Sequence, residues 1–375
     1  MRSERDAYIA LNMIRELGPV TVRVLSESLG SVAALFTADA RRLLAVSGAS
    51  PEPVRRLLDS RRRVDPGAEV ERARRLGVRL VTPVDPDYPD PLRRLYDPPL
   101  ALYLRGTLEP DDRRAVAIVG SRHTTGYGRE IASAFAWQLA RDGWTIVSGL
   151  ARGIDTRAHQ GALQADGGRT LAVLGGGLHD LYPPENRELA ESITAHGALV
   201  TEFPLGREPD RTTFPIRNRI VSGLAQAVLV VEAGQGSGAM ITAHVAADQG
   251  KPVFVVPGRV DGPTFQGSHQ LIKSGAHLVD SVADIQDELG SLFHAVTRPS
   301  GPPVPPSDPP PKPQAPLSEP ESVILQRLMD EERMDLDTLT RQSGLPASTV
   351  TATLLMLEMK RLVRPLPGRR VEIVR

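Results

Sequence analysis

The sequence predicts an α/β protein with a doubly wound, mostly parallel sheet at its centre, a small helical domain before it and a winged helix after it. Three observations lead to this prediction. Short apolar runs alternate with helical patterns through the middle of the chain. Residues 5–60 show helical spacing alone, interrupted by glycine turns. Residues 297–320 are dense in proline and separate a short tail from the rest.

Length and composition limit the possible functions. The chain has 375 residues, more than one core usually holds, so two or three domains are expected. Its 45 Lys and Arg balance its 45 Asp and Glu, so any nucleic-acid surface must be a local patch. The absence of cysteine excludes disulfides, thiolate nucleophiles and cysteine-ligated metal centres. The 8 histidines show no metal-binding spacing, so neither a metal nor a cofactor is expected.

The sequence shows no sign of export or membrane insertion. The opening residues MRSERDAY lack the apolar core of a signal peptide. No uninterrupted apolar run approaches the ~18 residues that suggest a membrane span. We therefore expect a cytoplasmic protein without membrane contact.

Residues 1–66 are expected to form a small helical domain of the SAM or helix-hairpin-helix kind. Leu11, Ile14 and Leu17 share one helical face, and Gly18-Pro19 ends that helix. The turns at 17–20 and 46–49 resemble hairpins whose exposed N–H groups can bind a DNA phosphate. Any small helical bundle needs such turns, so a purely structural role is the favoured interpretation here.

Residues 67–290 are expected to form the central domain. Buried strands are predicted at 115–119, 145–147, 170–174, 198–200, 227–231 and 253–256, with an added edge strand near 98–106. Helices are predicted at 126–141, 155–165, 185–196, 216–225 and 238–249. Crossovers of this length give a parallel sheet covered on both faces, an extended Rossmann-like fold. Ligands of such sheets bind beyond the carboxyl ends of the strands.

Loops after several strands carry glycine and arginine at that edge. Gly120, Ser121 and Arg122 follow the first strand, and Arg152 lies in a glycine-flanked turn after the second. A second glycine-rich loop, with Gly236, Ser237 and Gly238, opens a helix after the fifth strand. Glycine permits close approach to backbone N–H groups, and a helix start attracts anions. We therefore expect a phosphate-binding edge, although simple chain reversal is the alternative for each turn alone.

Signatures of nucleotide enzymes are missing. The first loop reads GSRHTTGYG instead of GxGxxG, and Gly250-Lys251 precedes a strand, unlike a Walker A lysine. No nucleophile elbow occurs at a strand-to-helix turn. We therefore expect a protein that is not an enzyme. The competing hypothesis is a nucleotide or nucleoside-phosphate hydrolase on a similar sheet, with Glu232 as acid-base group; a pure scaffold is the third.

The most specific cluster lies at residues 210–220. It contains one aromatic residue among basic and polar ones: Arg211, Phe214, Arg217, Asn218 and Arg219. Guanidinium groups bind phosphates, and a phenyl ring offers a stacking surface worth ~1–3 kcal/mol per base, so the cluster suits single-stranded nucleic acid. In the alternative interpretation Phe214 packs on its own helix and the arginines pair with Glu202 or Glu208.

Five short motifs occur in order across about residues 70–290. They are VGSR at 119–122, SGLARGID at 148–155, FPIRNRI at 214–220, EA with SG at 232–238, and PG at 257–258. Together they strongly resemble the DNA-processing protein A (DprA, also called Smf) family. The resemblance implies a Rossmann-like protein that binds single-stranded DNA, acts as a homodimer in natural transformation, protects incoming strands, and loads RecA recombinase onto DNA coated by single-strand-binding protein.

The resemblance also assigns roles to individual residues. Arg122 corresponds to the phosphate-binding arginine of the family's Gly-Ser-Arg motif. Arg211 and Phe214 correspond to a basic and an aromatic residue that line the same pocket. His269 stands where the family usually has asparagine, which puts in doubt the hydrogen bond expected from that side chain.

The tail begins after the proline-rich linker, assigned to 291–320. A capping box at 318–321 starts a helix, two further helices follow, and two extended segments around Pro367-Gly368 predict a hairpin. Residues 321–375 are therefore predicted to form a winged helix. Arg364, Arg369 and Arg370 are its phosphate candidates, and protein contact or weak duplex DNA contact is expected in preference to sequence reading. Family members similarly carry an accessory winged helix whose role varies.

Overall fold

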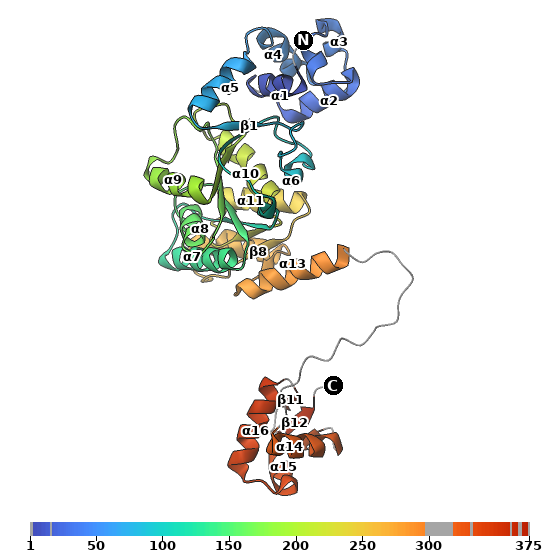
Figure 1. The fold of residues 1–375 in the computed structure, drawn as a ribbon, viewed down its shortest axis with the longest axis vertical. Helices are drawn as coiled ribbons and strands as arrows, with labels where there is room; N and C mark the ends of the chain where they lie inside the picture. The colour runs from blue at the N-terminus through green and yellow to red at the C-terminus, as the bar shows by residue number, and fades with distance from the viewer. Residues whose placement is uncertain are drawn as a thin grey trace. The chain divides into compact units, whose positions relative to one another are not determined.

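The computed structural model describes residues 3–15, 17–296, 318–330, 333–360, 362–366 and 370–373 (Figure 1). The chain divides into two compact units, residues 1–298 and 299–375. Most of the predicted linker, residues 297–317, lies outside the described residues. Its first positions are helical, because α13 (Val282–Val296) continues past the boundary predicted at 290. Buried Ile285 and Leu289 fix that helix to the core.

A nine-stranded sheet forms the centre of the first unit, in the order β1-β2-β6-β5-β4-β3-β7-β8-β9. The strands are β1 (Arg79–Val81), β2 (Leu102–Gly106), β3 (Ala115–Val119), β4 (Thr145–Ser148), β5 (Thr170–Val173), β6 (Gly197–Thr201), β7 (Ala227–Val230), β8 (Val253–Val255) and β9 (His277–Leu278). Strands β3 to β9 are parallel, whereas β1 and β2 add an antiparallel edge. The predicted doubly wound sheet is confirmed.

Helices cover both faces of this sheet. One face packs against α7 (Gly126–Arg141), α8 (Ile154–Leu163), α9 (Arg187–His196) and α13. The other packs against α10 (Thr213–Leu224), α11 (Gly238–Asp248) and α12 (Gln266–Lys273). All five side chains of β3 are buried, which is why its sequence is continuously apolar.

The strand order reverses between β3 and β7. Strands β4, β5 and β6 extend to one side of β3, and β7, β8 and β9 extend to the other. In open α/β sheets the crevice at this switch point, beyond the carboxyl ends of the strands, is the usual ligand site. The loops that begin at Gly120 and Val231 therefore meet where a ligand is expected.

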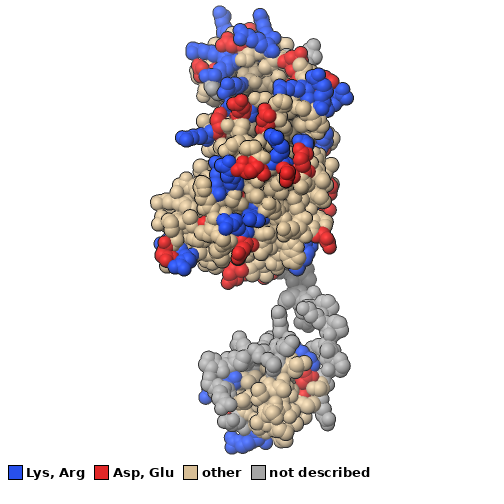
Figure 2. All heavy atoms as spheres, turned by 90° about the vertical axis from the view of Figure 1, so that its left-hand side faces the viewer, with Lys and Arg blue, Asp and Glu red and all other residues tan. Residues whose placement is uncertain are grey.

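Charged side chains are mixed on the surface of this unit. Figure 2 shows Lys and Arg interspersed with Asp and Glu over the face that it draws. This agrees with the balanced composition. A binding site for a polyanion must therefore be a local arrangement of a few arginines.

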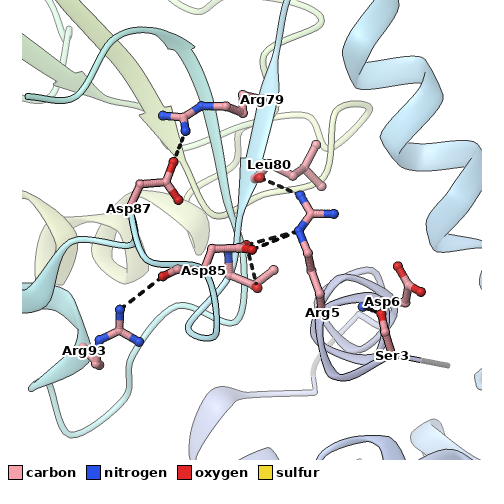
Figure 3. A network of polar contacts seen from close by, with 9 residues as sticks. Ser3, Arg5, Asp6, Arg79, Leu80, Asp85, Asp87 and Arg93 are labelled. Carbon is pink, nitrogen blue, oxygen red and sulfur yellow. Dashed lines mark hydrogen bonds and ion pairs between the residues drawn. The ribbon is translucent and has the colours of Figure 1, made fainter.

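The N-terminal helices have a core of their own. They are α1 (Glu4–Asn12), α2 (Pro19–Leu29), α3 (Ala40–Leu44) and α4 (Pro51–Ser60), followed by α5 (Pro66–Arg75) and the short α6 (Asp90–Arg93). Buried leucines such as Leu11, Leu25 and Leu57 fill this core. Polar contacts attach α1 to the sheet: Arg5 Nε lies 3.2 Å from Asp85, and Arg5 Nη2 donates to the Leu80 carbonyl at 2.9 Å (Figure 3).

The second unit has winged-helix topology, as predicted. It contains α14 (Glu319–Asp330), β10 (Arg333–Asp335), α15 (Leu336–Ser343), α16 (Ala347–Met359), β11 (Val363–Leu366) and β12 (Arg370–Ile373). Its three strands form an antiparallel sheet in the order β10-β12-β11. Lys360 Nζ pairs with Glu321 at 2.7 Å, so this cation is engaged within the unit. Arg370 is exposed, while the predicted turn and Arg369 lie outside the described residues.

Candidate nucleic-acid interface

A small pocket lies beyond the carboxyl ends of β3, β4 and β5. Its wall includes Arg122, Arg152, Gly175, Tyr182, Phe214 and Arg217. The cavity has a volume of about 30 Å³, which leaves room for a water molecule and not for a base. Side chains therefore fill the pocket in this conformation.

Phe214 is the centre of this pocket. The guanidinium carbon of Arg122 lies 4.8 Å from the centre of its ring, and the ring of Tyr182 lies 6.2 Å away. Gly175 lies against the ring, because a Cβ atom there would come within 2.7 Å of Phe214 Cδ1. Phe214 is half-buried, so it keeps a surface for further contact.

Asp210 fixes the backbone that carries Phe214. Its carboxylate accepts hydrogen bonds from the backbone N–H of Thr212 at 2.8 Å and of Thr213 at 3.1 Å. The pKa of Asp210 lies well below its usual range. The largest cause is a hydrogen bond from the Thr212 hydroxyl, and the two backbone N–H groups add to it. Arg207 Nη2 also pairs with it at 2.5 Å. The start of α10 is thus anchored where the ring enters the pocket.

Arg217 supports the pocket from inside. It is 4% exposed and donates to the carbonyl of Gly149 at 2.6 Å and to that of Val173. Burial lowers its pKa to about 10, against the attraction of Asp155, which raises it. Arg217 thus lines the pocket while its guanidinium is engaged with backbone carbonyls, and a phosphate contact by this residue stays a prediction. It joins α10 to the ends of β4 and β5, and its Nε has no hydrogen-bond partner within the described residues.

Arg219 is directed away from the pocket. Its guanidinium pairs with Glu202 and, through Nε, with Asp97 at 3.2 Å. For this arginine the alternative interpretation, pairing with Glu202, is the one that the structure bears out. Burial raises the pKa of Glu202, while Arg219 acts in the opposite direction. Arg219 is thus a structural residue, and its assignment as a DNA contact is corrected.

The second glycine loop lies beside α10 but outside the pocket. The side chain of Asn218 donates to the Gly238 carbonyl at 3.4 Å, which links α10 to the start of α11. Gly236 and Gly238 are exposed. The buried hydroxyl of Ser237 has no hydrogen-bond partner within the described residues. A phosphate contact at these three residues stays a prediction.

The start of α7 is occupied by a side chain of the protein itself. Glu232 is fully buried and accepts hydrogen bonds from Thr124 Oγ1 at 2.7 Å, Thr125 N at 3.0 Å and Thr125 Oγ1 at 2.9 Å. The Ser121 N–H donates to the Glu232 carbonyl at 2.7 Å. The Glu232 carboxylate therefore occupies the donors of Thr124 and Thr125 at the start of α7, and its backbone carbonyl takes the Ser121 N–H. Arg122 and His123 are exposed in this loop, and a phosphate contact at Gly120 and Ser121 stays a prediction.

Glycines at this edge allow loops to pack closely. A Cβ at Gly120 would come within 2.5 Å of Ile154, and one at Gly149 within 2.5 Å of the Arg217 guanidinium. Gly153 has a φ of +80° and lies against the Ser121 carbonyl. These glycines shape the edge by close packing, which the sequence alone could not separate from ligand contact.

The remaining predicted residues lie on the surface. Arg152 is exposed and pairs with Glu185. Arg211 is exposed, and no hydrogen bond or ion pair is found for it within the described residues. Tyr182, which lines the pocket beside Phe214, was not predicted as a site residue. Its position as an aromatic residue in a loop that follows a strand is the sequence signal that could have indicated it. His269, at the family's usual asparagine position, does form a hydrogen bond, to the Gly258 carbonyl at 3.1 Å.

Among the described residues, no group of three His, Cys, Asp or Glu side chains could hold a metal ion. No helix among them is both long enough and apolar enough to cross a bilayer.

Comparison with known proteins agrees with this architecture. Residues 79–290 match the family model described as DNA recombination-mediator protein A, and residues 308–369 match the DprA winged helix domain. A protein named Smf from Synechocystis is 33% identical over 99% of both chains. Smf from Escherichia coli is 39% identical, covering 77% of this chain and 75% of its own.

Two solved structures are also similar. DNA processing protein A from Streptococcus pneumoniae has a TM-score of 0.64 at 30% identity, covering 76% of this chain and 98% of its own. The protein of the same name from Helicobacter pylori, studied for its single-stranded DNA binding mode, has a TM-score of 0.51 at 29% identity, covering 58% and 96%. With one family model matching more than half of its length, this chain belongs to the DNA recombination-mediator protein A (DprA/Smf) family.

Proposed function

We propose that this protein binds single-stranded DNA in the Phe214 pocket and acts as a recombination mediator. The observation that carries the proposal is the stacked pair of Arg122 and Phe214 at the carboxyl end of the sheet. A guanidinium beside a half-exposed ring offers a phosphate contact and a stacking surface side by side. The similar protein from Helicobacter pylori has a single-stranded DNA binding mode, which supports this ligand.

Strand binding then requires a local rearrangement. The pocket is too small for a base while Arg122 covers the ring. A base reaches the Phe214 ring when Arg122 leaves the ring and binds a phosphate of the strand. Arg211, which lies just before α10, is exposed and can contact the neighbouring phosphate. Arg217 holds the pocket walls together through its bonds to the carbonyls of Gly149 and Val173.

The wider role follows from family membership. We infer that the protein works in the cytoplasm as a homodimer, protects incoming strands in natural transformation, and loads RecA onto DNA coated by single-strand-binding protein. RecA ATPase activity on coated strands should therefore rise when this protein is added. The winged helix would add a protein contact or a weak duplex DNA contact.

The competing hydrolase hypothesis requires Glu232 to contact a substrate. Its carboxylate is fully buried and bonded to Thr124 and Thr125, so no substrate reaches it in this conformation. Incubation with nucleotides should release neither base nor phosphate. Release at a rate that Glu232→Gln abolishes would instead establish the hydrolase.

The test of strand binding is a fluorescence-anisotropy titration at two salt concentrations. Arg122→Ala combined with Arg211→Ala should weaken binding and reduce the magnitude of the salt slope by about 1.4, because two fewer phosphates are neutralised at about 0.7 each on a single strand. Arg74→Ala is the matched control, since Arg74 is an exposed arginine paired with Glu71 on α5. Unchanged affinity and slope in the double variant would overturn the pocket assignment.

A further inference from the structure

The pocket continues into an open groove along α7 and α8. Arg122 and Arg152 line both the pocket and a neighbouring hollow, which also includes Arg129 and Arg157. Arg129 and Arg157 in turn line a third hollow, together with Trp137. Because they share these side chains, the three hollows adjoin one another. The residues that link them are called here the Trp137 track: Arg122, Arg152, Arg129, Arg157 and Trp137.

Positive charge dominates the middle of this track. Arg129 donates to the Thr124 carbonyl at 3.0 Å, and Arg157 donates to the Gln160 side chain at 3.2 Å. Neither forms an ion pair with a carboxylate within the described residues. The acidic residues of the lining are Glu185, which pairs with Arg152, Glu130, and Asp180 in the pocket itself. The two unpaired guanidinium groups are therefore available to phosphates.

Trp137 lies at the far end of the track and contributes little to the core. It is 40% exposed, whereas the other tryptophan, Trp144, is 5% exposed. The guanidinium of Arg141 lies 4.9 Å from its ring centre. An indole partly covered by an arginine repeats the arrangement of Phe214 and Arg122. Along α7, Trp137 lies 11 residues after Gly126, which corresponds to ~16 Å along the helix axis.

We propose that a DNA strand leaving the Phe214 pocket follows this track, with its phosphates at Arg129 and Arg157 and one base stacked on Trp137. This inference rests on the proposed function and adds a second stacking site to it. A strand confined to the pocket does not reach Trp137, because Trp137 lies ~16 Å along α7 from Gly126. Trp137 should therefore affect long strands and not short ones.

The test compares oligonucleotides from about 4 to about 16 nucleotides, the range of common single-strand site sizes. Wild-type affinity should rise with length. Trp137→Ala should leave the shortest oligonucleotide unaffected and weaken the longest by roughly 5- to 100-fold, the loss of one stacked base. Tyr96→Ala is the matched control, since Tyr96 is also exposed and covered by an arginine, Arg23 at 4.6 Å, but lies outside the track.

A second measurement tests the same contact in the wild-type protein, where no substitution can impair folding. Tryptophan fluorescence of the wild type should be quenched by long oligonucleotides and not by short ones. Trp137→Phe retains buried Trp144 and should lose this quenching while keeping most of the affinity, because phenylalanine also stacks.

The outcomes separate the two proposals. If short oligonucleotides bind, and Trp137→Ala does not change how affinity rises with length, the track is overturned and the pocket is not. No binding at any length would overturn both the track and the pocket.

Discussion

The guanidinium carbon of Arg122 lies 4.8 Å from the ring centre of Phe214. The arginine proposed to bind a phosphate therefore covers the ring proposed to stack on a base. A cation–π contact of this kind is worth ~0.5–1 kcal/mol at an exposed site, which a strand can replace with stacking and a phosphate contact.

We expect Phe214→Leu to weaken single-stranded DNA binding by roughly 5- to 100-fold, because leucine keeps apolar bulk but loses the aromatic face. Phe214→Tyr should bind nearly as the wild type does. Anisotropy titrations with a short oligonucleotide measure both. Equal affinity of the leucine variant would exclude stacking at this position.

Gly175→Ala is expected to weaken strand binding without unfolding the protein. A Cβ at this position comes within 2.7 Å of the Phe214 ring, so the ring must move. Gly18→Ala is the control, since no atom lies within 4 Å of its Cβ position and its φ of −76° suits alanine. If both variants bind alike in the titration, the wall formed by Gly175 is not part of the strand site.

Glu232→Ala should destabilise the protein. The change leaves the Thr125 N–H and two hydroxyl groups without their acceptor at the start of α7. A buried donor without a partner costs about 1–3 kcal/mol. Urea unfolding measures the loss, with Glu130→Ala on the exposed side of α7 as control. Equal stability of the two variants would contradict the capping role.

The free energy of unfolding should fall in acid because the buried His159 side chain is neutral in the folded state. Burial lowers the pKa of this histidine from 6.5 to about 3. Its Nδ1 lies 2.7 Å from Thr170 Oγ1, which itself donates to the Ile146 carbonyl, so Nδ1 is the donor and Nε2, which has no partner, stays unprotonated. The pKa of His159 is lower in the folded state than in the unfolded state, so the unfolded state takes up a proton first as the pH falls. The stability that neutral His159 contributes is therefore complete above about pH 6.5 and is lost as the pH falls toward about 3.

Urea unfolding at several pH values measures this contribution. The loss between pH 7.5 and pH 5 should reach up to about 2 kcal/mol in the wild type. His159→Gln should flatten that dependence, whereas His196→Gln, at an exposed histidine, should leave it unchanged. A wild-type profile that His159→Gln does not alter would show that the buried imidazole is not responsible.

The sheet was largely predictable because its strands are buried on both faces. All six short segments that were predicted as buried strands of the central domain became strands: β3, β4, β5, β6, β7 and β8. Such runs report burial directly. The short β9 is exposed at both positions, so it carries no comparable apolar signal.

The binding residues were less predictable, and the arginines of α10 show why. At 3.6 residues per turn, side chains two positions apart are rotated by roughly 200° about the axis, so Arg217 and Arg219 lie on nearly opposite sides of the helix and do not face the same pocket. Which of them meets Glu202, and which meets the carbonyls of Gly149 and Val173, depends on how the helix lies on the sheet. Periodicity alone does not contain that information.

The carboxylate of Glu232 also has a consequence for regulation. It already takes up the hydrogen-bond donors at the place where related folds seat a dinucleotide pyrophosphate. Cellular ATP or NAD should accordingly leave the capture of DNA undisturbed, and the protein can respond to the strand irrespective of the energy state of the cell.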